Sequence, residues 1–131
     1  MSIGKSTFSF CIALTSIILP TSLISIGNNS FYHCTGLTSI KIPDSVTDIE
    51  DYAFQDCSGL ESVTIPNAIT SINYFVFCGC RALTSVTIPK SVTSMGYGVF
   101  LKCSKLSTAS IPKGLRNFTG VFPDGVAITE Y

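Results

Sequence analysis

Leu37-Thr-Ser-Ile-Lys-Ile-Pro43 is the stretch that decides the fold, because close copies of it recur along the whole chain. The copies begin at leucines that are 23 residues apart: Leu14, Leu37, Leu60, Leu83 and Leu106. A fixed period of this length is typical of a solenoid, in which each unit buries its apolar side by stacking on its neighbours. The sequence therefore predicts one stack of repeats.

Each copy of the phrase has the pattern of a short strand. Its first, fourth and sixth residues are apolar, as Leu37, Ile40 and Ile42 are, and β-branched residues are frequent in it. Proline lacks the N–H group needed for a sheet hydrogen bond, so each strand should end at its proline. The prolines are Pro20, Pro43, Pro66, Pro89 and Pro112.

The second half of each unit predicts turns. Each second half begins with two apolar residues three positions apart. In the last unit these are Leu115 and Phe118. In two other units the pair is followed by a glycine, Gly27 or Gly96. Glycine at this place predicts a turn with positive φ. Phenylalanine and cysteine then recur three residues apart, a spacing that shares one helix face and so predicts a short helical turn. They are Phe8, Phe31, Phe54, Phe77 and Phe100, with Cys11, Cys34, Cys57, Cys80 and Cys103.

The periodicity predicts a single solenoid over 1–131, with a partial unit at 1–13, four full units at 14–105 and a degraded terminal unit at 106–131. In the terminal unit Phe122 falls one residue short of the phenylalanine column, no cysteine follows, and Pro123-Asp-Gly125 predicts a turn before a last short strand. A degraded end unit is typical of a cap. The partial first unit should leave the strand that begins at Leu14 as an unpaired edge, which favours self-association.

Composition and charge exclude several classes of protein. The hydrophobic content of 46% excludes a disordered chain, and the net charge of zero gives no basic field that would attract nucleic acid. No apolar run is long enough for a transmembrane helix. The charges are unevenly placed: most acids lie between Asp44 and Glu61, and most bases lie between Arg81 and Arg116. The sequence therefore predicts an acidic middle and a basic carboxyl-terminal half.

Residues that could carry chemistry form no recognisable catalytic or metal site. Five of the six cysteines lie in the repeat column, which indicates buried free thiols that pack as small hydrophobic groups, although neighbouring thiols could also form a disulfide. Cys78 and Cys80 form an isolated Cys-x-Cys, which is a weak metal signal. His33, the one histidine, has no partner arrangement for nucleophilic catalysis. We therefore expect no enzyme activity, no metal and no cofactor.

Small polar side chains should cover the outer face of the strands. If Ile40 and its equivalents point inward, the alternating residues point outward and stack from unit to unit. Such residues either keep a strand face solvated or, joined by Tyr52, Tyr74 and Tyr97, form a protein-binding surface of the kind that solenoids use. The face comprises Thr38, Ser39, Lys41, Glu61, Ser62, Thr64, Thr84, Ser85, Thr87, Ser107 and Thr108.

The repeat resembles the BspA-like leucine-rich-repeat family in its recurrent Ile-Pro and Phe-x-x-Cys, best seen from Leu37 to Cys57. The resemblance implies an α/β solenoid: a right-handed leucine-rich-repeat stack with short parallel strands on one face and turns or short helical turns on the other. It also implies a surface or secreted protein of a bacterium or protozoan parasite that adheres to host matrix proteins such as fibronectin or fibrinogen.

The function expected from these observations is a non-enzymatic protein-binding module, an adhesin at the cell surface. The alternative is a cytoplasmic structural scaffold. Unpaired thiols and the lack of a leader sequence ahead of the first repeat favour that alternative.

Overall fold

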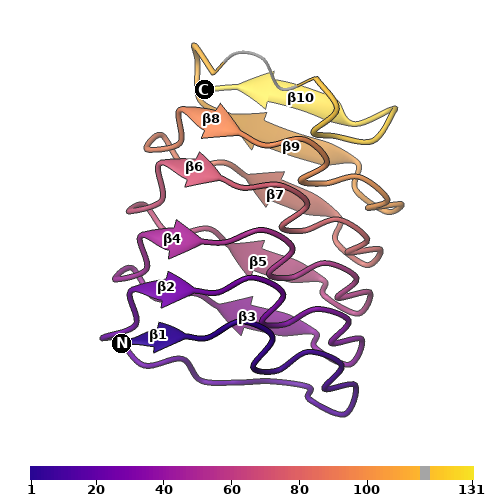
Figure 1. Cartoon of the computed structure of the whole chain (residues 1–131). Coiled ribbons are helices and arrows are strands. Elements are labelled where there is room, and N and C mark those ends of the chain that lie inside the picture. The colour runs from indigo at the N-terminus through magenta and orange to yellow at the C-terminus, as the bar shows by residue number, and fades with distance from the viewer. Residues whose placement is uncertain (116–118) are drawn as a thin grey trace.

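The computed structural model describes residues 1–115 and 119–131 as a stack of parallel turns (Figure 1). Arg116 and Phe118, named above, lie outside the described residues. Two columns of short strands run along the stack, and all the strand pairs in them are parallel. No helix occurs among the described residues, and therefore none that could cross a membrane.

The first column contains the strands predicted from the repeated phrase. They are β3 (Ser39–Lys41), β5 (Ser62–Thr64), β7 (Ser85–Thr87), β9 (Thr108–Ile111) and β10 (Ala127–Glu130). The register follows the repeat, because Ser39 lies opposite Ser62, and Ser85 opposite Thr108. The buried Ile40 between exposed Ser39 and Lys41 confirms the predicted alternation.

The second column was not predicted. It contains β1 (Ser2–Ile3), β2 (Ser25–Ile26), β4 (Asp48–Ile49), β6 (Ser71–Ile72) and β8 (Ser94–Met95). Each of these strands has only two residues, which is too short to show the alternation that identifies a strand from sequence. The apolar residue of each pair points into the stack, and Ile26, Ile49 and Ile72 are buried.

The predicted helical turn at the phenylalanines is wrong, because this part of each unit consists of turns. The Phe31 amide donates to the Ala53 carbonyl of the next unit at 2.8 Å, and the Phe54 amide donates to Val76 at 2.9 Å. An amide that bonds the next unit is not available for an α-helical bond within its own unit. Left-handed residues on either side of Phe31, at Asn29 and His33, also interrupt a helix.

The predicted positive φ at Gly27 and Gly96 is also wrong, since neither is among the residues with positive φ. The left-handed position lies two residues later, at Asn29, with a φ of 57°. Glycine is favoured at Gly27 by close packing, because a Cβ there would lie 2.8 Å from the Ile3 carbonyl oxygen. The same holds at Gly96, where a Cβ would lie 2.9 Å from the Tyr74 amide nitrogen.

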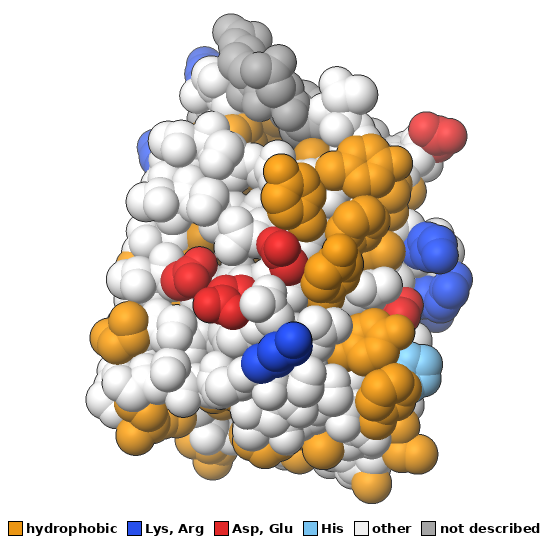
Figure 2. Space-filling view, viewed as in Figure 1, with side chains coloured by type: hydrophobic (Ala, Val, Ile, Leu, Met, Phe, Trp, Pro, Cys, Tyr) orange, Lys and Arg blue, Asp and Glu red, His pale blue; other side chains and the backbone are white. Residues whose placement is uncertain are grey.

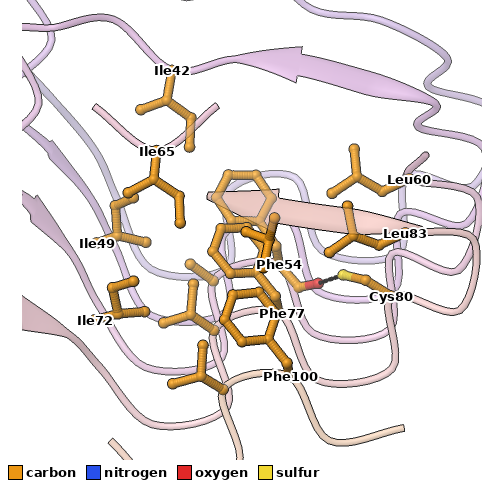
Figure 3. Packing of buried hydrophobic residues seen from close by; sticks show 14 of the residues in the cluster. Ile42, Ile49, Phe54, Leu60, Ile65, Ile72, Phe77, Cys80, Leu83 and Phe100 are labelled. Atoms are coloured by element: carbon orange, nitrogen blue, oxygen red, sulfur yellow. Dashed lines mark hydrogen bonds between the residues drawn. The ribbon is translucent and has the colours of Figure 1, made fainter. Parts of the chain in front are cut away.

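The core is built around one column of stacked phenylalanine rings (Figure 3). Adjacent ring centroids lie 5.1 to 5.6 Å apart. Phe122 belongs to this column, with its centroid 5.3 Å from that of Phe100. In the sequence, Phe122 comes one residue earlier than the 23-residue period requires. The last turn is one residue shorter to match, because the Phe100 amide donates to Val121, whereas the Phe77 amide donates to Val99. The column comprises Phe8, Phe31, Phe54, Phe77, Phe100 and Phe122.

Each strand column is divided into two sheets. In the described residues no ladder joins β5 to β7 or β4 to β6, so the sheets are β3–β5 and β7–β9–β10 in one column, and β1–β2–β4 and β6–β8 in the other. The turn halves remain bonded across both breaks: the Phe54 amide donates to Val76 across the break between β4 and β6, and the Phe77 amide donates to Val99 across the break between β5 and β7. The stack is therefore continuous, but the first strand column has a seam between the third and fourth full units, and the second strand column has one between the second and third.

The two ends of the stack differ. At the carboxyl end the predicted turn is present at Asp124 and Gly125, and β10 pairs with β9 so that Ala127 lies opposite Thr108. At the amino end the predicted strand that begins at Leu14 is not formed. Among the described residues, one backbone bond joins this segment to the next unit, from the Thr38 amide to the Thr15 carbonyl at 3.3 Å. Apolar side chains remain exposed there, and Ile18 is 97% exposed.

Candidate functional site

The outer face of the first strand column carries all eleven residues that the sequence placed on it, and each of them is exposed. We call this surface the hydroxyl face: Thr38, Ser39, Lys41, Glu61, Ser62, Thr64, Thr84, Ser85, Thr87, Ser107 and Thr108. Alternation along each strand positions them, since the intervening Ile40, Val86 and Ala109 are buried. The register then brings equivalent residues side by side, as it does Lys41 and Thr64.

A shallow groove of about 430 Å³ crosses the hydroxyl face along the seam between β5 and β7. Four hydroxyl side chains line it from the two strands: Ser62, Thr64, Ser85 and Thr87. Asp44, Asn67 and Tyr131 line it near the strand ends, and the apolar Val63, Ile65, Val86 and Pro89 complete the lining. The groove therefore presents hydroxyl, carboxylate and amide groups together with one aromatic ring.

Tyr131 is the member of this groove that sequence reasoning missed. Its hydroxyl donates to the Ile88 carbonyl at 2.6 Å, although the two residues are 43 apart in the chain. The Lys90 ammonium lies 5.7 Å from the centre of its ring, a distance that permits a cation–π contact. These two contacts hold the ring over the end of the strand face. A bond between residues so far apart leaves no local sequence signal.

The tyrosines that were expected to join the hydroxyl face lie elsewhere, so that part of the prediction is wrong. Tyr52, Tyr74 and Tyr97 follow β4, β6 and β8, the strands of the second column. In Figure 1 these strands lie in front of β3, β5, β7 and β9. Because the two columns form different sides of the stack, the tyrosines belong to a separate surface.

All six cysteines are free, and the repeated ones form the predicted column of thiols. Each buried thiol in it donates to a phenylalanine carbonyl of the preceding unit, and Figure 3 draws this bond for Cys80. The Sγ to oxygen distances are 3.0 Å for Cys34, 3.1 Å for Cys57, 3.4 Å for Cys80 and 3.2 Å for Cys103.

Burial also keeps these thiols protonated. It raises the pKa of Cys57 to about 12, with a further contribution from the neighbouring Cys34 thiol, and it raises the pKa of Cys103 to about 12. Thiolate is the form that attacks electrophiles and binds metals, so the column is suited to packing. Among the described residues no group of three or more His, Cys, Asp or Glu is placed to hold a metal ion.

His33 lies against aromatic rings in a half-buried position. Its ring centroid is 5.2 Å from that of Phe10 and 5.9 Å from that of Tyr32. Its backbone is left-handed, with a φ of 59°, and its amide donates to the Gln55 carbonyl. These contacts give His33 a structural role in the turns.

The hydroxyl face can form many weak, neutral hydrogen bonds over a wide area. Serine and threonine hydroxyls both donate and accept, so they adapt to different partner groups. The face carries few charges: Lys41 ends β3, and Glu61 immediately precedes β5. Such an extended wall suits contact with a macromolecule better than enclosure of a small substrate. Fold and face together define a leucine-rich-repeat solenoid, a class of protein that typically serves as a non-enzymatic binding scaffold.

The family follows from comparison with known sequences. The family model described as BspA type leucine rich repeat region matches residues 1–122 with six copies. The chain therefore belongs to the BspA-type leucine-rich-repeat family. No curated protein sequence matches it.

Solved structures show the same architecture. The leucine-rich repeat protein of T. pallidum is 27% identical with a TM-score of 0.82, over 98% of this chain and 66% of that one. A leucine rich cell surface protein of Faecalibacterium prausnitzii is 28% identical with a TM-score of 0.78, over 88% of this chain and 32% of that one. The pneumococcal vaccine antigen PcpA, at 24% identity and a TM-score of 0.76, shows the fold alone. The chain thus spans less than two thirds of the length of these proteins.

Proposed function

We propose that the chain is the binding module of a cell-surface adhesin, and that its hydroxyl face contacts host matrix proteins such as fibronectin or fibrinogen. The observation that carries the proposal is the hydroxyl face itself, where eleven polar side chains from neighbouring strands stand exposed in one register. The structural relative from F. prausnitzii, described as a cell surface protein, supports a surface location.

The groove is the region of the hydroxyl face where we expect a partner to make its central contacts. Protein interfaces concentrate their binding energy in a few central residues, and tyrosine is enriched among them. Tyr131 is 40% exposed and lines the groove together with Thr64 and Thr87. A partner loop that enters the groove would meet this ring and the surrounding hydroxyl groups.

Binding to immobilised fibronectin and fibrinogen tests the proposal. A variant with Lys41→Ser, Glu61→Ser and Thr87→Ala removes polar groups from three strands of the hydroxyl face. The matched control, Lys5→Ser with Thr70→Ala and Asp124→Ser, changes exposed residues of the same types elsewhere. We expect the first variant to bind at least about tenfold more weakly and the control to bind as the wild type does. Equal binding by all three proteins would overturn the assignment of the face.

A second candidate function is a cytoplasmic scaffold, which the six free cysteines favour, because reducing compartments keep thiols unpaired. Surface biotinylation of intact cells separates the two candidates. Labelling of the protein on intact cells supports the adhesin, whereas a wholly cytosolic pool would contradict it.

A further inference from the structure

An exposed column of aromatic rings runs along the side of the stack that carries the second strand column. The rings of Tyr52 and Phe75 are stacked with their centroids 5.5 Å apart, and Phe75 meets Tyr97 at 5.6 Å with an interplanar angle of 74°. Tyr52 is 37% exposed and Tyr97 is 55% exposed. Figure 2 shows hydrophobic side chains gathered in a ridge on this face. We call Tyr52, Phe75 and Tyr97 the exposed aromatic column, in which the half-buried Phe75 contacts both of the exposed tyrosines.

The backbone beneath two of these rings is unfavourable for them. Tyr52 and Phe75 have positive φ values of 61° and 56°, a region that bulky residues rarely occupy. The equivalent places in neighbouring units hold Asn29 and Gly98, which tolerate this conformation well. The fold therefore accepts smaller residues here, and folding alone does not explain the aromatic side chains. Strained residues of this kind often mark functional surfaces.

Acidic side chains lie directly beside the exposed aromatic column (Figure 2). Asp51 precedes Tyr52, and its Oδ1 accepts a bond from the Tyr74 amide at 3.1 Å. Asp48 accepts from the Asn73 side chain at 3.4 Å, and Glu50 accepts from the Asn28 amide at 2.9 Å. All three donors are neutral, so these bonds position the carboxylates without cancelling their charge.

We propose that the exposed aromatic column and the carboxylates of Asp48, Glu50 and Asp51 form a second docking surface, for a protein segment in which lysine or arginine alternates with apolar residues. Apolar side chains of the partner pack on the rings, while its cations pair with the carboxylates and add cation–π attraction at the tyrosines. Charge complementarity selects this occupant over an acidic one. The surface lies on the other strand column, so it is independent of the hydroxyl face.

Two labelled synthetic peptides test the proposal by fluorescence anisotropy: one alternates arginine with leucine, and the other replaces each arginine with glutamate. The arginine peptide should bind, and added salt should weaken its binding. Phe75→Asn should lower its affinity at least about tenfold without lowering the melting temperature, since asparagine suits the left-handed backbone. Tyr52→Asn should have the same two effects on affinity and melting temperature, and it tests a second ring of the column.

The pair Asp48→Asn and Asp51→Asn keeps the oxygen acceptors and removes two charges. It should weaken binding of the arginine peptide and reduce the effect of salt. The control variant Ile18→Ser removes an exposed apolar side chain at the amino end and should leave binding unchanged. The proposal is overturned if the glutamate peptide binds as tightly as the arginine peptide. It is also overturned if the aromatic and carboxylate variants bind as the wild type does.

Discussion

The protein contains two columns of aromatic rings that differ in almost everything except their spacing. Phe54 and Phe77 lie in the interior with centroids 5.5 Å apart, and the exposed Tyr52 stacks on the half-buried Phe75 at the same 5.5 Å. Phe54 is fully buried, while Tyr52 is 37% exposed. The spacing comes from the repeat register alone, so stacking by itself says nothing about role. Burial and backbone conformation distinguish the column that stabilises the fold from the one available to a partner.

The largest effect on stability is expected when a ring of the interior column is removed. Phe77→Ala removes a ring that stacks on Phe54 and Phe100 on both sides. A buried Phe→Ala change costs about 3 to 5 kcal/mol because it leaves a cavity. We expect a loss of that size in the free energy of unfolding, measured by urea denaturation followed by circular dichroism. A loss below about 1 kcal/mol would show that the column is not the core of the fold.

Alkaline pH offers a second way to weaken the interior. The pKa of the Cys57 thiol is raised from 9.0 to about 12 by burial, so unfolding releases its proton once the pH exceeds about 9. Its contribution to stability is therefore complete below pH 9.0 and is lost progressively as the pH rises toward about 12. The full loss is on the order of a few kcal/mol.

Measured between pH 8 and pH 11, the free energy of unfolding should fall less steeply in Cys57→Ala than in the wild type. Cys78→Ala provides a control, because Cys78 lies outside the repeated column and also has a raised pKa. Cys78→Ala should also reduce the fall in the free energy of unfolding with pH, but by less than Cys57→Ala does. Identical curves for Cys57→Ala and the wild type would contradict the burial of this thiol.

A smaller effect is expected at two serines that occupy equivalent places in different units. The Ser45 hydroxyl donates to the Leu23 carbonyl at 2.6 Å, whereas the buried Ser91 hydroxyl has no hydrogen-bond partner among the residues that the structure describes. Removing an unsatisfied buried hydroxyl should help folding, and removing a bonded one should harm it. Ser91→Ala should therefore raise the free energy of unfolding by about 1 kcal/mol, and Ser45→Ala should lower it by about 1 kcal/mol.

Ala68 occupies the same place in the unit between these two serines, so alanine is compatible with the position. Thermal unfolding of the two variants side by side makes the comparison. A change of the same sign in both would mean that the hydroxyl groups have equivalent surroundings, contrary to the structure.

Much of the first strand column could be predicted from sequence because its signal is local and repeated. Ile40 and Lys41 alternate inward and outward as expected, and the strand ends at Lys41, two residues before Pro43. The thiol column was also predictable, because a residue that recurs at the repeat period must stack on its copies. The same alternation predicts the hydroxyl face, and the exposure of its residues agrees with that prediction.

The rest depends on contacts between units, which leave no local pattern. Two-residue strands such as β4 form because a neighbouring unit supplies hydrogen bonds. The phenylalanine-to-cysteine spacing suited a helix equally well, and only the bond from Phe31 to the next unit excludes one. Tyr131 reaches Ile88 across the strand ends. The groove arises from a seam between β5 and β7, although both strands match the repeated phrase.

The most direct test of the difference between the two aromatic columns is the free energy of unfolding of Phe75→Asn, measured in the same urea series as Phe77→Ala. Phe75→Asn gives up ring stacking worth about 1 kcal/mol and relieves a left-handed backbone strain of similar size. The predicted value therefore lies within about 1 kcal/mol of the wild type, while Phe77→Ala loses about 3 kcal/mol or more. Equal losses in the two variants would mean that the exposed column stabilises the fold as the interior column does, and would contradict its assignment to binding.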